Sequence, residues 1–81
     1  MAENPTARIE VGGHTDSDGE PEANQALSQA RADAVVNALI AAGVSADSLD
    51  SVGYGDTIPI ASNETGEGKA RNRRIEFLLL V

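Results

Sequence analysis

The chain has 81 residues, no cysteine and a net charge of −7, so it forms one small domain without disulfide support. With six basic against thirteen acidic residues, and without the aromatic residues that stack on bases, the composition argues against a nucleic-acid partner. No apolar run is long enough to span a bilayer and the first residues do not form a signal peptide, so we expect no direct membrane insertion and a targeting segment outside this chain.

The first half of the chain predicts a strand followed by a helix. Residues 1–7 are expected to be a flexible lead-in to a domain that covers residues 8–81. Apolar and polar residues alternate over Arg8–Gly12, which predicts a short strand. The polar segment 14–22 predicts a loop.

The helix is delimited by local signals at both ends. Pro21 or Asn24 opens it, because proline suits the first helical turn and asparagine suits a cap. Gly43 ends it, because glycine is a common helix terminator. These signals predict a helix of about twenty residues.

The second half predicts two more strands. Ser45 is placed to cap a short helical turn, and Leu49–Tyr54 predicts a second strand. A long polar loop is expected from Asp56 to about Arg71. Ile75–Val81 is almost entirely apolar, so we expect a final strand that is buried on both faces and central in the sheet.

This order predicts an α+β fold, built as a two-layer sandwich with the helix on one face of the sheet. The strand–helix–strand unit implies a parallel crossover, and the last strand, which follows a loop, is expected to be antiparallel. One helix and three strands barely cover a strand that is buried on both faces. Either a second chain completes the sheet, or the full domain has further elements before residue 1.

Arg31 is the first candidate for a functional residue. It lies four residues from Leu27 and four from Val35, within an expected apolar stripe of the helix. A guanidinium stays charged and is costly to bury without an anionic partner, and Asp16 is the nearest candidate upstream. Arg31 and Asp16 together predict either a site for a ligand with a positive and a negative group, or a structural salt bridge. The two interpretations are compatible.

The other reactive side chains do not assemble a recognisable catalytic or metal motif. His14, Asp16 and Asp18 offer nitrogen and oxygen ligands, but they lack the acidic positions of a calcium loop and the further histidines of a zinc site. Ser17 and Ser28 lie outside any nucleophile elbow. We therefore expect no enzyme activity, no metal and no cofactor.

Asn72-Arg73-Arg74 precedes the last strand. On a strand the two arginines point to opposite faces, so one of them can brace the acidic loop that begins at Asp16, while Asn72 caps nearby backbone groups. The alternative is a strand entrance that is simply solvated.

Four ordered motifs make the chain similar to the OmpA-like C-terminal domain family, over roughly Arg8 to Val81. They are Gly13-His14-Thr15-Asp16, Asn24-x-x-Leu27-Ser28-x-x-Arg31-Ala32-x-x-Val35, Gly53-Tyr54-Gly55-Asp56-x-x-Pro59-Ile60-Ala61 and Asn72-Arg73-Arg74-Ile75-Glu76. The family includes peptidoglycan-associated lipoproteins and flagellar stator proteins.

The resemblance implies non-covalent binding of peptidoglycan through the diaminopimelate of its stem peptide. It implies that Asp16 and Arg31 hold this amino acid, and that the domain anchors an envelope protein to the cell wall on the periplasmic side. The residues expected to form the site with them are Thr15, Asn24, Leu27, Asn72, Arg73 and Arg74.

The chain departs from the family pattern at its start. The family domain normally has a strand and a helix before the strand at Arg8–Gly12, so we expect an N-terminally truncated domain. An exposed sheet edge would then be closed by self-association into a homo-oligomer. The alternative function is a structural or self-association domain in which Asp16–Arg31 only locks the fold.

Overall fold

The computed structural model describes residues 8–80, so the predicted lead-in at residues 1–7 lies outside the described residues. The elements are β1 (Arg8–His14), α1 (Pro21–Ala41), a 3-10 turn (Ala46–Ser48), β2 (Leu49–Gly55), α2 (Gly66–Asn72) and β3 (Ile75–Leu80). This order confirms the predicted α+β class. It also shows a helix, α2, in a segment that the sequence predicts as loop.

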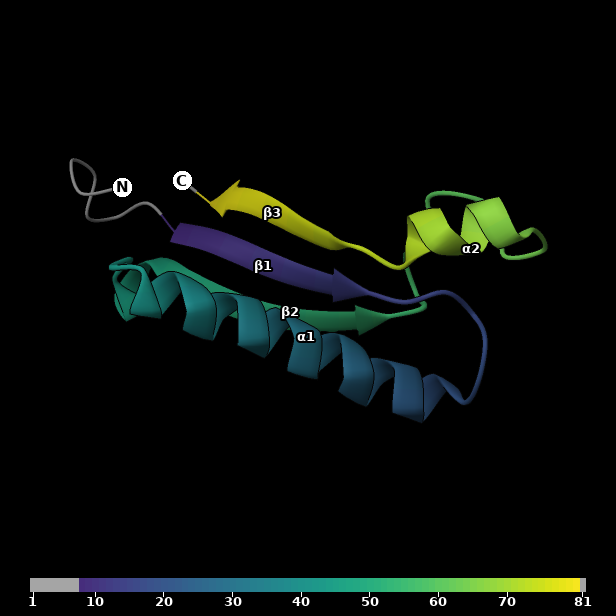
Figure 1. The fold of residues 1–81 in the computed structure, drawn as a ribbon, viewed down its shortest axis with the longest axis horizontal. Coiled ribbons are helices and arrows are strands. Elements are labelled where there is room, and N and C mark those ends of the chain that lie inside the picture. The colour runs from purple at the N-terminus through teal and green to yellow at the C-terminus, as the bar shows by residue number, and fades with distance from the viewer. Residues whose placement is uncertain (1–7, 81) are drawn as a thin grey trace.

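The three strands form one mixed sheet in the order β2-β1-β3, with α1 packed on one face (Figure 1). β1 pairs in parallel with β2 and antiparallel with β3, so that Ile9 lies opposite both Leu49 and Leu79. The parallel crossover and the antiparallel last strand are therefore confirmed.

The prediction that the last strand is central and buried on both faces is wrong. β1 occupies the centre, and β3 is an edge strand in which Phe77, Leu78 and Leu79 are 60%, 55% and 58% exposed. An apolar run indicates burial on both faces only if other elements cover it. Here α1 lies over β1 and β2, so β3 has neither a second neighbour nor a covering helix among the described residues.

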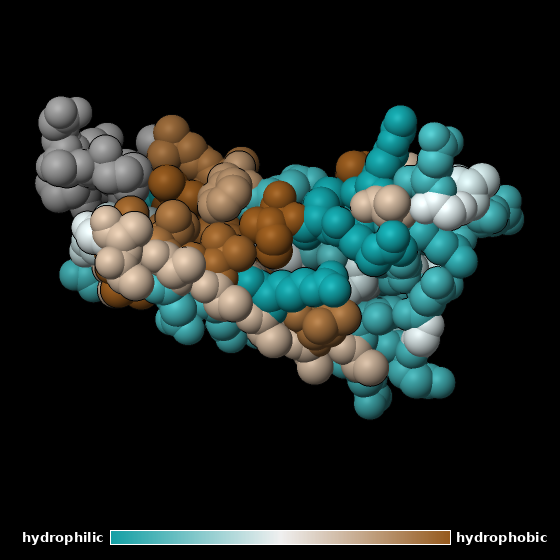
Figure 2. All heavy atoms as spheres, viewed as in Figure 1, coloured by the Kyte–Doolittle hydropathy of each residue, from teal (hydrophilic) through white to brown (hydrophobic). Residues whose placement is uncertain are grey.

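The molecule is elongated, with extents of 44 × 19 × 18 Å. Hydrophobic residues gather at the end where β3 finishes, and hydrophilic residues gather around α2 at the other end (Figure 2). The buried hydrophobic side chains in the described chain are Val11, Ala32 and Leu49. None of the described helices combines the length and the hydropathy needed to span a bilayer.

Glycines in the strands let α1 approach the sheet closely. A Cβ on Gly13 would overlap the carbonyl oxygen of Ser28, and a Cβ on Gly53 would lie 2.5 Å from the backbone nitrogen of Gln29. The Ser28 hydroxyl accepts a hydrogen bond from Gly55 N at 2.9 Å and donates to Gln25 O at 2.8 Å. This face of the helix is therefore packed by small and polar groups.

The buried face of α1 differs from the predicted apolar stripe. Its buried residues are Asn24, Ser28 and Ala32, which follow one another at a spacing of four. Leu27 is 44% exposed, and Arg31 is exposed as well. The prediction that Arg31 lies within a buried stripe is wrong, because the glycines of β1 and β2 select the neighbouring face of the helix.

The predicted element ends agree with the structure where local chemistry determines them. α1 begins at Pro21, and Gly43 follows its end with a positive φ of 106°. The Ser45 hydroxyl accepts from Asp47 N at 3.3 Å and caps the 3-10 turn.

Candidate functional site

Asp16 lies just beyond the end of β1 and is the anchor of the candidate site. Its side chain is only 9% exposed, and its Oδ2 lies 2.6 Å from Nη1 of Arg73. Its Oδ1 accepts the backbone N–H of Asp18 at 2.9 Å. The hydrogen bond from Arg73 is the main reason that the pKa of Asp16 lies below its usual value, followed by the bond from Asp18. The carboxylate is therefore ionised at neutral pH.

The loop that carries Asp16 is held between α1 and α2. Asn24, buried on α1, donates from Nδ2 to the backbone oxygens of Asp16 at 3.3 Å and Asp18 at 2.9 Å. Lys69 on α2 pairs with Asp18 at 3.1 Å, and Thr15 Oγ1 donates to Asp16 O at 2.9 Å. These contacts fix the direction of the Asp16 side chain.

Asn72, at the end of α2, is completely buried and fully hydrogen-bonded. Its Oδ1 accepts from the backbone N–H groups of Ile60 at 2.8 Å and Ala61 at 3.0 Å. Its Nδ2 donates to Ala61 O at 3.0 Å and to Asn63 Oδ1 at 2.8 Å. The predictions that Asn72 caps backbone groups and that one of the two arginines braces the Asp16 loop are both confirmed, and the bracing arginine is Arg73.

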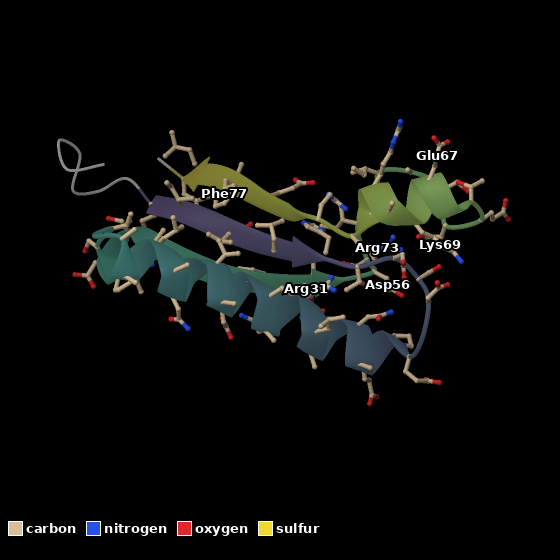
Figure 3. The ribbon with its side chains drawn as sticks, viewed as in Figure 1. Arg31, Asp56, Glu67, Lys69, Arg73 and Phe77 are labelled. Carbon is tan, nitrogen blue, oxygen red and sulfur yellow. The ribbon has the colours of Figure 1, made fainter. Side chains whose placement is uncertain are left out.

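Arg31 forms no ion pair among residues 8–80, and the expected Asp16–Arg31 pair is replaced by Asp16–Arg73. Figure 3 shows Arg31 on α1, whereas Arg73, Lys69 and Asp56 gather at the α2 end of the molecule. Arg31 lies one turn after Leu27 on the exposed side of the helix. Its guanidinium is thus not committed to another described side chain.

Arg74 turns away from Asp16. It pairs with Glu76 and donates to the backbone oxygens of Asn72 at 3.2 Å and Ile58 at 3.0 Å. The structure therefore brings together Thr15, Asp16, Asn24, Asn72 and Arg73. Leu27 and Arg31 lie on the outer side of α1, and Arg74 is used elsewhere.

Two contributors to this site, Lys69 and Asn63, were missed by the sequence analysis. Lys69 precedes Arg73 by four residues, so a helix at this point places both on one side. The helix has only seven residues, two of which are glycine, and its signal is correspondingly weak. Asn63 Oδ1 also accepts from Ser17 N at 3.3 Å, a loop-to-loop contact without a sequence signature.

The remaining reactive residues have structural roles. The His14 ring stacks on Tyr54 with a centroid distance of 5.1 Å. In the part of the chain that the structure describes, no group of three or more His, Cys, Asp or Glu side chains is arranged to hold a metal ion. The Ser28 hydroxyl is engaged with backbone groups and is not a free nucleophile.

The fold and the site define a small α+β binding domain with charged side chains gathered where β1 and β2 end. The chain belongs to the OmpA family, whose family model matches residues 1–73. The two curated relatives described next are named as a lipoprotein and as a peptidoglycan-binding protein, and neither name describes an enzyme.

Two curated relatives illustrate the match. The probable lipoprotein YiaD of Escherichia coli K12 is 49% identical over 79 residues, which are 98% of this chain and 36% of YiaD. The peptidoglycan-binding protein ArfA of Mycobacterium tuberculosis H37Rv is 45% identical over 75 residues, which are 93% of this chain and 23% of ArfA. The chain therefore spans about a third of YiaD and about a quarter of ArfA.

Two solved structures share the fold. The peptidoglycan-associated lipoprotein from Burkholderia pseudomallei has a TM-score of 0.90 at 34% identity, covering 98% of this chain and 67% of that one. The C-terminal domain of Helicobacter pylori MotB has a TM-score of 0.87 at 33% identity, covering 94% of this chain and 59% of that one.

Proposed function

We propose that this domain binds peptidoglycan non-covalently through the diaminopimelate of the stem peptide, and that Asp16 and Arg31 hold that residue. The observation that carries the proposal is the ionised carboxylate of Asp16. It is nearly buried, and it lies just beyond the end of β1. The names of ArfA and of the Burkholderia lipoprotein support peptidoglycan as the partner.

The two charges suit the two ends of an amino acid. Asp16 accepts from the ligand ammonium, and Arg31 offers its planar fork to the carboxylate. Because Arg73 already pairs with Asp16, the ligand ammonium must either share the Asp16 carboxylate with the Arg73 guanidinium or displace that guanidinium. Thr15, Asn24 and Asn72 then position the loops around the ligand, and Leu27 supplies an apolar wall beside Arg31. We assign no direct ligand contact to Arg74.

This function places the domain in the cell envelope, on the periplasmic side, as an anchor for whatever it is attached to. One charged amino acid offers few contacts, so the affinity for a free stem peptide is expected to be modest. A wall polymer repeats the ligand many times, which raises the effective concentration for an anchored protein.

The test is a titration of meso-diaminopimelate into isotope-labelled protein, together with co-sedimentation with purified peptidoglycan. We expect amide shifts at Thr15 and Asp16, and at least a tenfold weaker affinity for Asp16→Asn and for Arg31→Gln, because each removes one charged contact. Arg71→Gln and Glu64→Gln are matched controls at exposed positions and should bind as the parent does. Unchanged binding by both site variants, with intact amide spectra, contradicts the proposal.

A second candidate function is self-association through the free edge of the sheet. The observation in its favour is the exposure of three consecutive apolar residues on β3. In this alternative the Asp16 pair only stabilises the fold. That pair is Asp16–Arg73, not the Asp16–Arg31 pair expected from the sequence. Sedimentation over a concentration series tests the self-association.

A further inference from the structure

The face of the sheet opposite α1 carries a hollow that the proposed peptidoglycan site does not use. Its volume is about 210 Å³, and its walls come from all three strands and from the loop after β2. The strand register places Glu76 opposite Gly12, and Leu78 opposite Glu10. Paired residues of an antiparallel ladder share a face, so these four positions line one surface.

Gly12 forms the floor of the hollow. A Cβ at this position would lie 3.0 Å from Cε2 of Tyr54 and 3.4 Å from Nε2 of His14, so a larger residue would fill the space. Tyr54 and His14 stack at an interplanar angle of 13°, and the Tyr54 hydroxyl donates to Glu10 at 2.6 Å. Aromatic stacking and this hydrogen bond hold the walls in place.

The charges around the hollow are predominantly negative. Glu10 uses one carboxylate oxygen to accept from Tyr54, and Glu76 uses one to accept from Arg74. Arg74 is the one cation that pairs with either carboxylate among the described residues, through Glu76, and its remaining bonds go to the backbone oxygens of Asn72 and Ile58. Each carboxylate keeps a second oxygen for another partner.

The hydrogen bonding of His14, which lines the hollow, is incomplete. The residue is only 3% exposed, yet its Nδ1 has no hydrogen-bond partner among residues 8–80. A buried nitrogen without a partner is uncommon in folded proteins and calls for an explanation. Burial also keeps the pKa of His14 below its usual value, so at neutral pH the ring adds no positive charge to repel a cation.

We propose that this hollow is a second binding site and that it takes a primary alkylammonium group. The ammonium lies between the free oxygens of Glu10 and Glu76, and its alkyl stem packs on Ile58 and Leu78, which line the same hollow. An anion is excluded by the two carboxylates. A metal ion is not favoured, because the described residues provide no group of three suitable ligands.

The test is a titration of n-butylammonium into isotope-labelled protein of the full 81 residues at neutral pH. We expect saturable amide shifts at Gly12, His14 and Leu78, with a dissociation constant on the order of 1 mM because two solvent-accessible carboxylates bind weakly. n-Butanol has a similar alkyl stem without the charge and should produce at least a threefold weaker interaction.

Variants separate this site from the proposed wall-binding site. Glu10→Gln and Glu76→Gln should each weaken butylammonium binding at least threefold while leaving diaminopimelate binding unchanged, and Glu64→Gln serves as the charge-matched control. Gly12→Ala should narrow the hollow and have the same effect. Equal shifts with n-butanol, or no loss in either glutamate variant, overturn the proposal whatever the outcome at Asp16.

Two natural sources present this chemical group, and the titration distinguishes them. Putrescine represents a free polyamine, and Nα-acetyl-lysine amide represents a lysine side chain on a partner protein. Tighter binding of putrescine assigns the site to a small diamine, and tighter binding of the lysine compound assigns it to a protein. If neither binds at concentrations that saturate with butylammonium, the proposal that the site serves an alkylammonium is overturned.

Discussion

Asp16 stabilises the fold only while it is charged. Its pKa is lowered in the folded chain, chiefly by the hydrogen bond from Arg73, so the folded state holds this proton less tightly than the unfolded chain does. The stabilisation is therefore fully present above the unfolded pKa of about 3.9 and is lost as the pH falls through the folded value. The site charge and the acid stability of the loop thus depend on the same carboxylate.

His14 should make the domain less stable at mildly acidic pH. Burial lowers its pKa in the folded state, so as the pH falls below about 6.5 the unfolded chain binds more protons than the folded chain does. Each pH unit in this window lowers the free energy of unfolding by at most about 1.4 kcal/mol. His14→Phe keeps an aromatic ring against Tyr54 and removes the titration.

Urea unfolding at pH 7.5 and pH 5.0 measures this effect. We expect the parent to lose up to about 2 kcal/mol more than His14→Phe between the two values, because acidic groups common to both proteins cancel in the comparison. Equal losses in the two proteins would mean that His14 does not take part in the acid response.

The packing of α1 against β1 depends on a close approach of the two backbones that only glycine at position 13 permits. Gly13→Ala places a methyl group against the carbonyl of Ser28, which belongs to the helix backbone and cannot rotate aside. We expect a loss of about 3 kcal/mol or more in the free energy of unfolding, because α1 must move away from the sheet. Chemical denaturation measures the loss.

Gly66→Ala is the matched control for that substitution. A Cβ at Gly66 meets no atom within 4 Å, and the residue begins α2, where alanine is the better helix former. We expect its free energy of unfolding to be unchanged or raised by up to about 1 kcal/mol. A similar loss for both alanine variants would show that the close approach at Gly13 does not determine stability.

The ends of α1 and the start of the 3-10 turn follow from local signals in the sequence. Pro21 and Gly43 delimit α1, and Ser45 caps the next turn, because each acts on its immediate neighbours. Asp16 is a site candidate because it is the nearest upstream anion for Arg31, and Arg73 is one because it lies at the entrance of the last strand. The sequence predicts that one of the two arginines at this entrance braces the loop that begins at Asp16, but not which of them pairs with Asp16, because that depends on how α2 is placed against the β1–α1 loop.

The buried face of α1 and the position of β3 could not be read from the sequence, because both depend on neighbouring elements. α1 is rich in alanine, so its faces differ little in hydropathy. The glycines at positions 13 and 53 decide which face docks. β3 has the composition of a central strand, but the order of the sheet gives the centre to β1.

At the scale of the whole molecule, one edge of the sheet has no neighbouring strand among residues 8–80. β3 offers the backbone groups of its outer edge, and residues 77–80 carry no charge that would discourage pairing with another strand. Phe77, which Figure 3 labels on this strand, is exposed together with its two apolar successors. An uncharged, exposed edge of this kind favours strand pairing between copies.

Leu78→Lys should therefore convert a self-associating chain into a monomer. Lysine on an edge strand opposes pairing between copies, whereas Ala38→Lys adds the same charge at an exposed position of α1. For the parent and for Ala38→Lys we expect a sedimentation coefficient and a melting midpoint that both rise with protein concentration, because association stabilises the folded state by mass action. For Leu78→Lys both should be independent of concentration. A parent chain that remains monomeric up to millimolar concentration, with a fixed melting midpoint, would show that the β3 edge does not recruit a second copy.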